Sequence, residues 1–189
     1  MEGWREIRLG EITKLIKRGI SPKYVEEAGY IVINQKCIRE GVLSFGDSRL
    51  SSKEKKVAAE KFVQIGDVLI NSTGTGTLGR TAPVRKLPST TTVDTHVTIL
   101  RGNEKVDKLF LGYLARYYEP LITLLGKGAT NQIELSASDL KVTKVVIPES
   151  IEVQRKIASI LSAYDDLIEN NLKRIKLLEE KAQLTYEEW

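Results

Sequence analysis

The sequence predicts an α+β (mixed α/β) globular domain, with a mixed or largely antiparallel sheet, followed by one long C-terminal α-helix. Two observations support this prediction. Residues 1–148 alternate short β-rich runs with glycine-containing and polar turns. Residues 151–189 contain no proline or glycine, and Ser150 is a suitable residue to cap a helix. We therefore expect a domain over residues 1–148 and a helix over residues 149–189.

Within the first domain, runs of β-branched and apolar residues bounded by turn residues predict strands over 30–34, 67–71, 96–100 and 142–147. Apolar residues at helical spacing predict helices over 8–17 and, more clearly, over 108–125. A polar stretch over 53–60 also has helical character. No internal repeat is visible.

The long helix has an apolar seam that is typical of a coiled coil. Seven of the nine seam positions are apolar, and the seam extends over about four heptads; its residues are Leu161, Tyr164, Ile168, Asn171, Ile175, Leu178, Ala182, Thr185 and Trp189. A buried asparagine at Asn171 would fix register and partner number. A helix of this length spans roughly 55 Å, more than the expected width of the domain, so we favour a helix that projects and pairs over one that packs on its own domain.

Composition excludes several classes of protein. The chain has 189 residues, of which 41% are hydrophobic and 29% charged, as in a folded globular protein. No apolar run is long enough for a membrane span, and the first residues lack the apolar core of a signal peptide. One cysteine, Cys37, and one histidine, His96, cannot form an internal disulfide or a Cys/His zinc site. We expect a protein of a reducing cytoplasm, with no membrane partner and no bound metal.

The charge is unevenly distributed. Residues 1–150 contain 23 Lys and Arg against 17 Asp and Glu, whereas residues 151–189 contain 6 against 8. A basic body with a slightly acidic tail is typical of a body that binds a polyanion and a tail that binds protein. A merely solvated surface is the alternative.

A glycine- and threonine-rich segment follows the predicted strand over 67–71. Gly74, Gly76 and Gly79 match G-x-G-x-x-G, and Arg80 stands where a P-loop has lysine. Both nucleotide-binding motifs require a helix to begin here. Pro83 and the β-branched residues around it favour another strand instead. As a loop between two strands, the segment can bring backbone N–H groups and hydroxyls near a DNA phosphate. The alternative is a tight turn that binds no ligand.

No catalytic constellation is recognisable in the sequence. His96 lies in a strand-like run beside Asp94, where a packed, hydrogen-bonded histidine is a more common occurrence than a catalyst. Neither a nucleophile elbow nor the spacing of metal ligands is present. We expect no enzymatic activity from this chain alone.

Polar and basic loops are the remaining candidates for function. Asn and Gln side chains can bind adenine with two hydrogen bonds, while Lys and Arg favour guanine or phosphate. Three segments contain such residues: 126–133, 34–39 and 14–18. Taken singly, each is better explained by a solvated loop; their recurrence on one basic body favours DNA binding. The predicted DNA contacts are Arg80, Lys127, Asn131, Gln132, Ser72, Thr73, Gln35 and Lys36.

The chain resembles one half of the DNA-specificity subunit of type I restriction–modification systems. The resemblance rests on Trp4 with Leu9-Gly10, on GDVLINSTG at 66–74 continuing to Gly79-Arg80, and on DTHVTIL at 94–100. It continues through GATNQIELS at 128–136, VIP at 146–148, QRKIA at 154–158 and DDLI at 165–168. These motifs follow one another in the family's order over nearly the whole chain.

The resemblance implies a target recognition domain followed by a long helix. In full-length members this unit occurs twice, the two helices form an antiparallel coiled coil, and each domain reads half of a split double-stranded DNA target. It also implies methyltransferase subunits as partners, which bind S-adenosylmethionine, so we expect no cofactor in this chain. An ATP-dependent restriction subunit joins the complex where DNA is cleaved, and the host is a bacterium or an archaeon.

This sequence contains one such unit, as in a half subunit or a truncated chain. Two copies would then pair through Leu161, Tyr164, Ile168, Asn171, Ile175 and Leu178 and read a split palindrome. From a helix of roughly 55 Å we expect half-sites about 10–16 base pairs apart. Two alternatives are a protein-interaction module without DNA affinity and a nucleotide-binding enzyme that uses residues 74–80.

Overall fold

The computed structural model describes residues 2–128, 133–187 and 189. In chain order its elements are β1 (Trp4–Arg8), η1 (Leu9–Glu11), β2 (Thr13–Arg18), β3 (Tyr24–Val25), β4 (Tyr30–Ile33), η2 (Gln35–Cys37), β5 (Ile38–Arg39), β6 (Val42–Leu43), β7 (Arg49–Ser51), η3 (Ala59–Lys61), β8 (Val68–Asn71), β9 (Thr81–Pro83), β10 (Thr91–Val93), β11 (Val97–Gly102), α1 (Lys108–Tyr117), α2 (Glu119–Leu124), α3 (Ala137–Val142), β12 (Lys144–Pro148) and α4 (Ile151–Glu187). The α+β class predicted from sequence is confirmed.

The centre of the domain is a four-stranded antiparallel sheet in the order β2-β11-β8-β9. Alternate residues of each strand enter two different cores. Ile70 and Leu100 pack with α1, α2 and α3 on one face, while Leu69 and Ile99 pack on the opposite face. Because both faces are covered, β8 is buried along its whole length, and its first three residues are all apolar.

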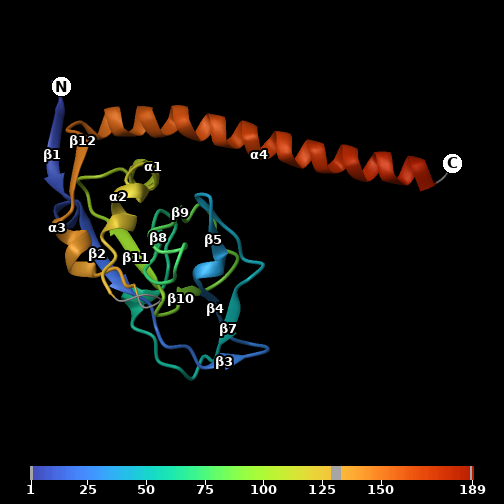
Figure 1. Cartoon of the computed structure of the whole chain (residues 1–189), viewed down its shortest axis with the longest axis horizontal. Helices are drawn as coiled ribbons and strands as arrows, with labels where there is room; N and C mark the ends of the chain where they lie inside the picture. Colours follow the sequence, from blue (N-terminus) through green and yellow to red (C-terminus); the bar gives the residue numbers. More distant parts are fainter. Residues whose placement is uncertain (1, 129–132, 188) are drawn as a thin grey trace.

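A second four-stranded sheet covers the other face, in the order β10-β4-β7-β3. It is mixed, because β10 pairs parallel to β4 while β7 pairs antiparallel to β4 and β3. Two short antiparallel pairs complete the domain, β5 with β6 and β1 with β12. The β1–β12 pair brings the start of the chain beside the beginning of α4 (Figure 1).

α4 is the longest element, with 37 residues, and it extends well beyond the domain (Figure 1). Its first turns contact the body: Gln154 and Ala158 are buried, and Gln154 Nε2 donates to the carbonyl of Pro148 at 2.9 Å. Further along, Arg85 Nη2 and the Tyr113 hydroxyl both donate to Asp165 Oδ2. Beyond Asp166, every helix residue described is exposed. No described helix is both long and apolar enough to cross a membrane.

Two of the predicted helices are wrong. Residues 8–17 form a 3₁₀ turn and then β2, where Leu15 and Ile16 point into the two different cores. Their apolar spacing reflects burial on both faces of a sheet, which mimics helical periodicity. Residues 53–60 form turns and the start of η3. There the Ser52 hydroxyl and carbonyl accept from the amides of Glu54 and Lys55, which replaces a helix that has no apolar face to bury.

The other elements lie close to their predicted positions. The helix expected over 108–125 is divided into α1 and α2 at Tyr118, because Pro120 lies in the first turn of α2 and cannot continue α1. The strand expected over 142–147 is β12, which begins later because Ser136 caps an additional short helix, α3. The strands expected over 30–34, 67–71 and 96–100 are β4, β8 and β11, and β9 follows the glycine-rich segment as predicted.

Candidate nucleic-acid interface

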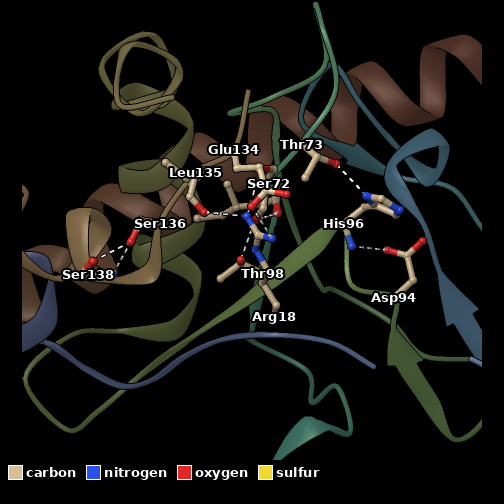
Figure 2. Close-up of polar contacts among 11 residues, drawn as sticks. Arg18, Ser72, Thr73, Asp94, His96, Thr98, Glu134, Leu135, Ser136 and Ser138 are labelled. Carbon is tan, nitrogen blue, oxygen red and sulfur yellow. Dashed lines mark hydrogen bonds and ion pairs between the residues drawn. The ribbon is translucent and has the colours of Figure 1, made fainter. Parts of the chain in front are cut away.

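Three segments that are distant in sequence meet at one end of the central sheet (Figure 2). They are residues 72–80 after β8, residues 94–96 before β11, and the end of the connection from α2 to α3. The amide of Leu135 donates to the carbonyl of Ser72 at 2.8 Å, and Thr73 forms a β-bridge with Glu134. Thr73 Oγ1 and His96 Nδ1 are 2.8 Å apart. These contacts hold the three segments as one surface.

Arg18, at the end of β2, connects the first and third of these segments. Its guanidinium donates to Glu134 Oε2 at 3.1 Å and to the carbonyls of Leu135 and Ser72 at 3.0 and 3.5 Å. In Figure 2 it lies between the backbone of Ser72 and that of Leu135. An arginine side chain with three acceptors from two loops fixes the distance between those loops.

The glycine-rich segment forms a tight turn without a helix. Gly74 and Gly79 both have positive φ. A side chain at Gly79 would collide with Thr123 of α2, and one at Gly74 would collide with Thr77 and Gln35. The glycines are therefore explained by the turn and by close packing, and the segment leads into β9 instead of into a helix that could bind a nucleotide phosphate.

A hollow beside this turn has both cationic and acidic residues in its wall. It has a volume of about 290 Å³, and its wall includes Arg80 and Glu119. Glu119 Oε2 accepts from the amide and hydroxyl of Thr81, each at 2.9 Å, and it also pairs with Arg116. Glu119 is therefore paired by hydrogen bonds and by Arg116 within the structure.

The predicted DNA contacts divide into those that join this surface and those that do not. Thr73 and Gln35 belong to it, because the Gln35 carbonyl accepts from Asn71 Nδ2 and its side chain accepts from Thr77. Lys36 is exposed next to Gln35. Lys127 is bridged by its backbone to Glu134, and its ammonium pairs with Asp139 at 2.9 Å.

Three further predictions have a different outcome. Ser72 is fully buried, and its hydroxyl bonds to Thr98 Oγ1 and to the Ile70 carbonyl, so the side chain is part of the sheet and a DNA contact does not fit its position. Asn131 and Gln132 lie outside the described residues. Their contact with DNA stays a prediction.

Burial and hydrogen bonding control the charge on Asp94. Its side chain is buried at the base of the turn, and burial raises the pKa of its carboxyl group. The amide of His96 donates to Asp94 Oδ1 at 2.9 Å, which opposes that effect by stabilising the carboxylate. The nearby carboxylate of Glu134 is paired with Arg18. Neither acidic group is therefore an unpaired negative charge in open solvent.

Comparisons with known proteins show the family of this chain. The family model of the type I restriction modification DNA specificity domain matches residues 1–180. The chain belongs to this family.

Two relatives of this specificity domain are known from Methanocaldococcus jannaschii. One is described as a type I restriction enzyme MjaX specificity subunit and is 26% identical over 184 residues, which is 94% of this chain and 43% of that protein. The MjaIX specificity subunit is 28% identical over 170 residues, 90% of this chain and 36% of that protein. The chain spans less than half the length of each.

A solved structure confirms the fold. The S subunit of a type I restriction–modification system from M. genitalium aligns with a TM-score of 0.64 and 18% identity, over 88% of this chain and 40% of that one. At this level of identity the likeness concerns the fold alone.

His96 lies in a different environment from the one predicted from the sequence. His96 was expected to be packed in a strand, yet β11 begins at Val97 and the His96 side chain is exposed in the turn before it. The sequence did contain a signal, because Asp94 two residues earlier is typical of a turn in which a carboxylate accepts from the backbone.

The α4 helix of the specificity domain has no partner in the described chain over its distal half. All six side chains predicted to pair helices are exposed: Leu161, Tyr164, Ile168, Asn171, Ile175 and Leu178. Ile160 and Leu167 are also exposed, at 53% and 56%, and lie beside the seam. The apolar surface of α4 is therefore wider than a two-helix seam requires.

Proposed function

We propose that residues 1–148 form a non-catalytic target recognition domain that reads one half of a bipartite DNA sequence. The observation that carries the proposal is the meeting of three loop segments, in a chain of the specificity-domain family, on a body with an excess of basic residues. Thr73, Gln35, Lys36, Arg80 and Lys127 present hydroxyl, amide and cationic groups there, and these are the groups that contact phosphates and base edges. Asn131 and Gln132 extend the same set.

We further propose that residues 149–189 pair two copies of the chain. The distal half of α4 exposes an apolar seam that is costly to leave in water, and an antiparallel partner of the same sequence would cover it. An asparagine at the seam, Asn171, would select one register of the two helices and one number of helices in the coiled coil. Two recognition domains related by a twofold axis would then read a split palindrome with half-sites about 10–16 base pairs apart.

The expected partners follow from the family and from the exposed surface of α4. Methyltransferase subunits, which carry S-adenosylmethionine, would use apolar side chains outside the seam, such as Ile160 and Leu167. An ATP-dependent restriction subunit would join where the system cleaves DNA. The complex would act in the cytoplasm of a bacterium or an archaeon.

Methylation mapping tests this proposal directly. The chain is co-expressed with the methyltransferase encoded beside it, and methyladenine is located by single-molecule sequencing, with the methyltransferase alone as control. We expect methylation of a split palindrome that depends on this chain. An asymmetric split motif would keep the recognition role but remove the homodimer. A soluble complex without new methylation would favour the protein-interaction module instead.

A further inference from the structure

His96, in the segment before β11, is held by two contacts that use different parts of the residue. Its backbone amide donates to Asp94 Oδ1 at 2.9 Å, which fixes the turn. Its ring nitrogen Nδ1 lies 2.8 Å from Thr73 Oγ1, which fixes the direction of the imidazole (Figure 2). The ring of this exposed side chain is therefore oriented before any ligand binds, which lowers the entropic cost of a further contact.

In this arrangement the second ring nitrogen of His96, Nε2, is available for a hydrogen bond to a ligand. Among the described residues, Thr73 is the polar partner of the imidazole, and it occupies Nδ1. When Nδ1 accepts from the Thr73 hydroxyl, Nε2 carries the proton and becomes a hydrogen-bond donor. DNA offers many acceptors to such a donor, including purine N7 and O6 atoms and phosphate oxygens.

The position of His96 relative to the loops supports a role in binding. Thr73 begins the glycine-rich segment and is bridged to Glu134, which is bridged in turn to Lys127. Arg18 neutralises Glu134, and Asp94 is buried beneath the turn. The imidazole thus lies against the glycine-rich segment proposed to face DNA, with the neighbouring carboxylates paired or covered.

We propose that His96 contacts the DNA target through Nε2 and that Thr73 is the positioning residue that orients the ring. The inference rests on the proposed function, because it assumes that this surface faces DNA. It adds a residue that composition and spacing had assigned to packing.

Four variants separate this contact from a merely structural tether. His96→Ala removes both ring nitrogens. His96→Gln places an amide near Nε2, whereas His96→Asn places one near Nδ1, where it can still bond Thr73. Thr73→Val removes the tether and leaves the imidazole. Affinity is measured for the full chain in complex with its methyltransferase, using a duplex with the mapped motif and one with a scrambled motif, and thermal unfolding checks the fold of each variant.

We expect His96→Ala and His96→Asn to weaken binding to the motif by roughly tenfold, the size of one good polar contact. His96→Gln should retain most of the affinity, and Thr73→Val should lose less than His96→Ala. A loss confined to the motif duplex identifies a base acceptor, and an equal loss on both duplexes identifies a phosphate.

Two results would overturn the inference while the proposed function stands. In the first, the wild-type complex binds its motif and His96→Ala binds it equally well. In the second, His96→Asn behaves as wild type while His96→Gln and Thr73→Val both match His96→Ala, which identifies a tether between loops. A wild-type complex with no preference for the motif would instead reject the proposed function, and this inference with it.

Discussion

Asp67 and Arg101 form a buried ion pair with two hydrogen bonds. Arg101 Nε donates to Asp67 Oδ1 at 2.7 Å and Nη2 to Oδ2 at 2.8 Å, and Nη2 also donates to the Phe62 carbonyl. Asp67→Ala leaves a buried guanidinium without its counter-charge, so we expect the free energy of unfolding to fall by about 3–5 kcal/mol. Urea denaturation followed by circular dichroism measures this change. The double variant Asp67→Leu/Arg101→Met should recover part of the loss, and a single variant as stable as wild type would contradict the role of the pair.

Asp94 makes stability depend on pH with a defined sign. Burial raises the pKa of its carboxyl group above the ordinary value of 3.8, so the folded state binds this proton more tightly than the unfolded state does. The stabilising contribution is complete below pH 3.8 and is lost as the pH rises through the raised pKa. Asp94→Asn keeps an acceptor for the His96 amide without a charge. We expect its stability relative to wild type to be greater at pH 7 than at pH 3.8, measured by denaturation at each pH; the opposite trend would contradict this assignment.

The candidate site could be predicted in part from the chemistry of single residues. Residue chemistry alone pointed to Thr73, Gln35 and Lys127, because hydroxyl, amide and ammonium groups are the usual contacts to DNA. Ser72 has the same chemistry but is buried, since it lies in line with β8 and its hydroxyl bonds across to Thr98. Accessibility depends on tertiary contacts with distant strands. It therefore cannot be derived from the type and spacing of neighbouring residues.

The attachment of α4 to the domain depends on a small polar cluster. The Tyr113 hydroxyl donates to Asp165 Oδ2 at 2.6 Å, and Arg85 contacts both groups. Burial, together with the Asp165 hydrogen bond, raises the pKa of Tyr113 from 10.0 to about 12. This contribution to stability is complete below pH 10 and is lost as the pH rises through about 12.

Tyr113→Phe tests this anchor. We expect the ultraviolet titration of wild type to contain a tyrosine that ionises near pH 12, and we expect the variant to lack it. The free energy of unfolding of the variant should also fall less steeply as the pH rises above 10, because the variant has no Tyr113 hydroxyl proton to lose. Tyr117→Phe is a matched control, since Tyr117 is exposed at 78%. A variant whose titration matched that of wild type would show that Tyr113 is not the perturbed group.

Elements were predictable where one local signal dominated. α4 has unbroken helix-forming sequence, and β8 is an apolar run between turns. The prediction over residues 8–17 was wrong because Leu9, Ile12 and Ile16 enter one core while Leu15 enters the other, which gives a 3₁₀ turn followed by a strand the apolar spacing of a helix. Only the neighbouring strand β11, some 80 residues later in the chain, determines which structure forms.

At the scale of the whole molecule, the apolar residues of the domain are largely buried, whereas those of the distal half of α4 are exposed. The central sheet is buried on both faces, whereas the distal half of α4 leaves Ile168, Ile175 and Leu178 at 57%, 50% and 64% exposure. An apolar stripe of this kind on an isolated helix is not stable by itself, because most helical stability in proteins comes from packing of the apolar face. A second copy is the partner we propose for it.

Ile168→Glu tests whether α4 pairs two copies. A charge in the centre of the seam is costly to bury, so we expect the wild-type chain to be a dimer at micromolar concentration and the variant to be a monomer, measured by light scattering coupled to size exclusion. Lys173→Gln is the matched control: it changes the charge by the same amount on the opposite face of the helix and should remain dimeric.

The monomeric variant should still bind a duplex with one half-site but lose its preference for the split motif. A wild-type chain that is monomeric at all concentrations, or a dimeric Ile168→Glu variant, would remove α4 as the pairing element and leave the recognition domain to act with a different partner.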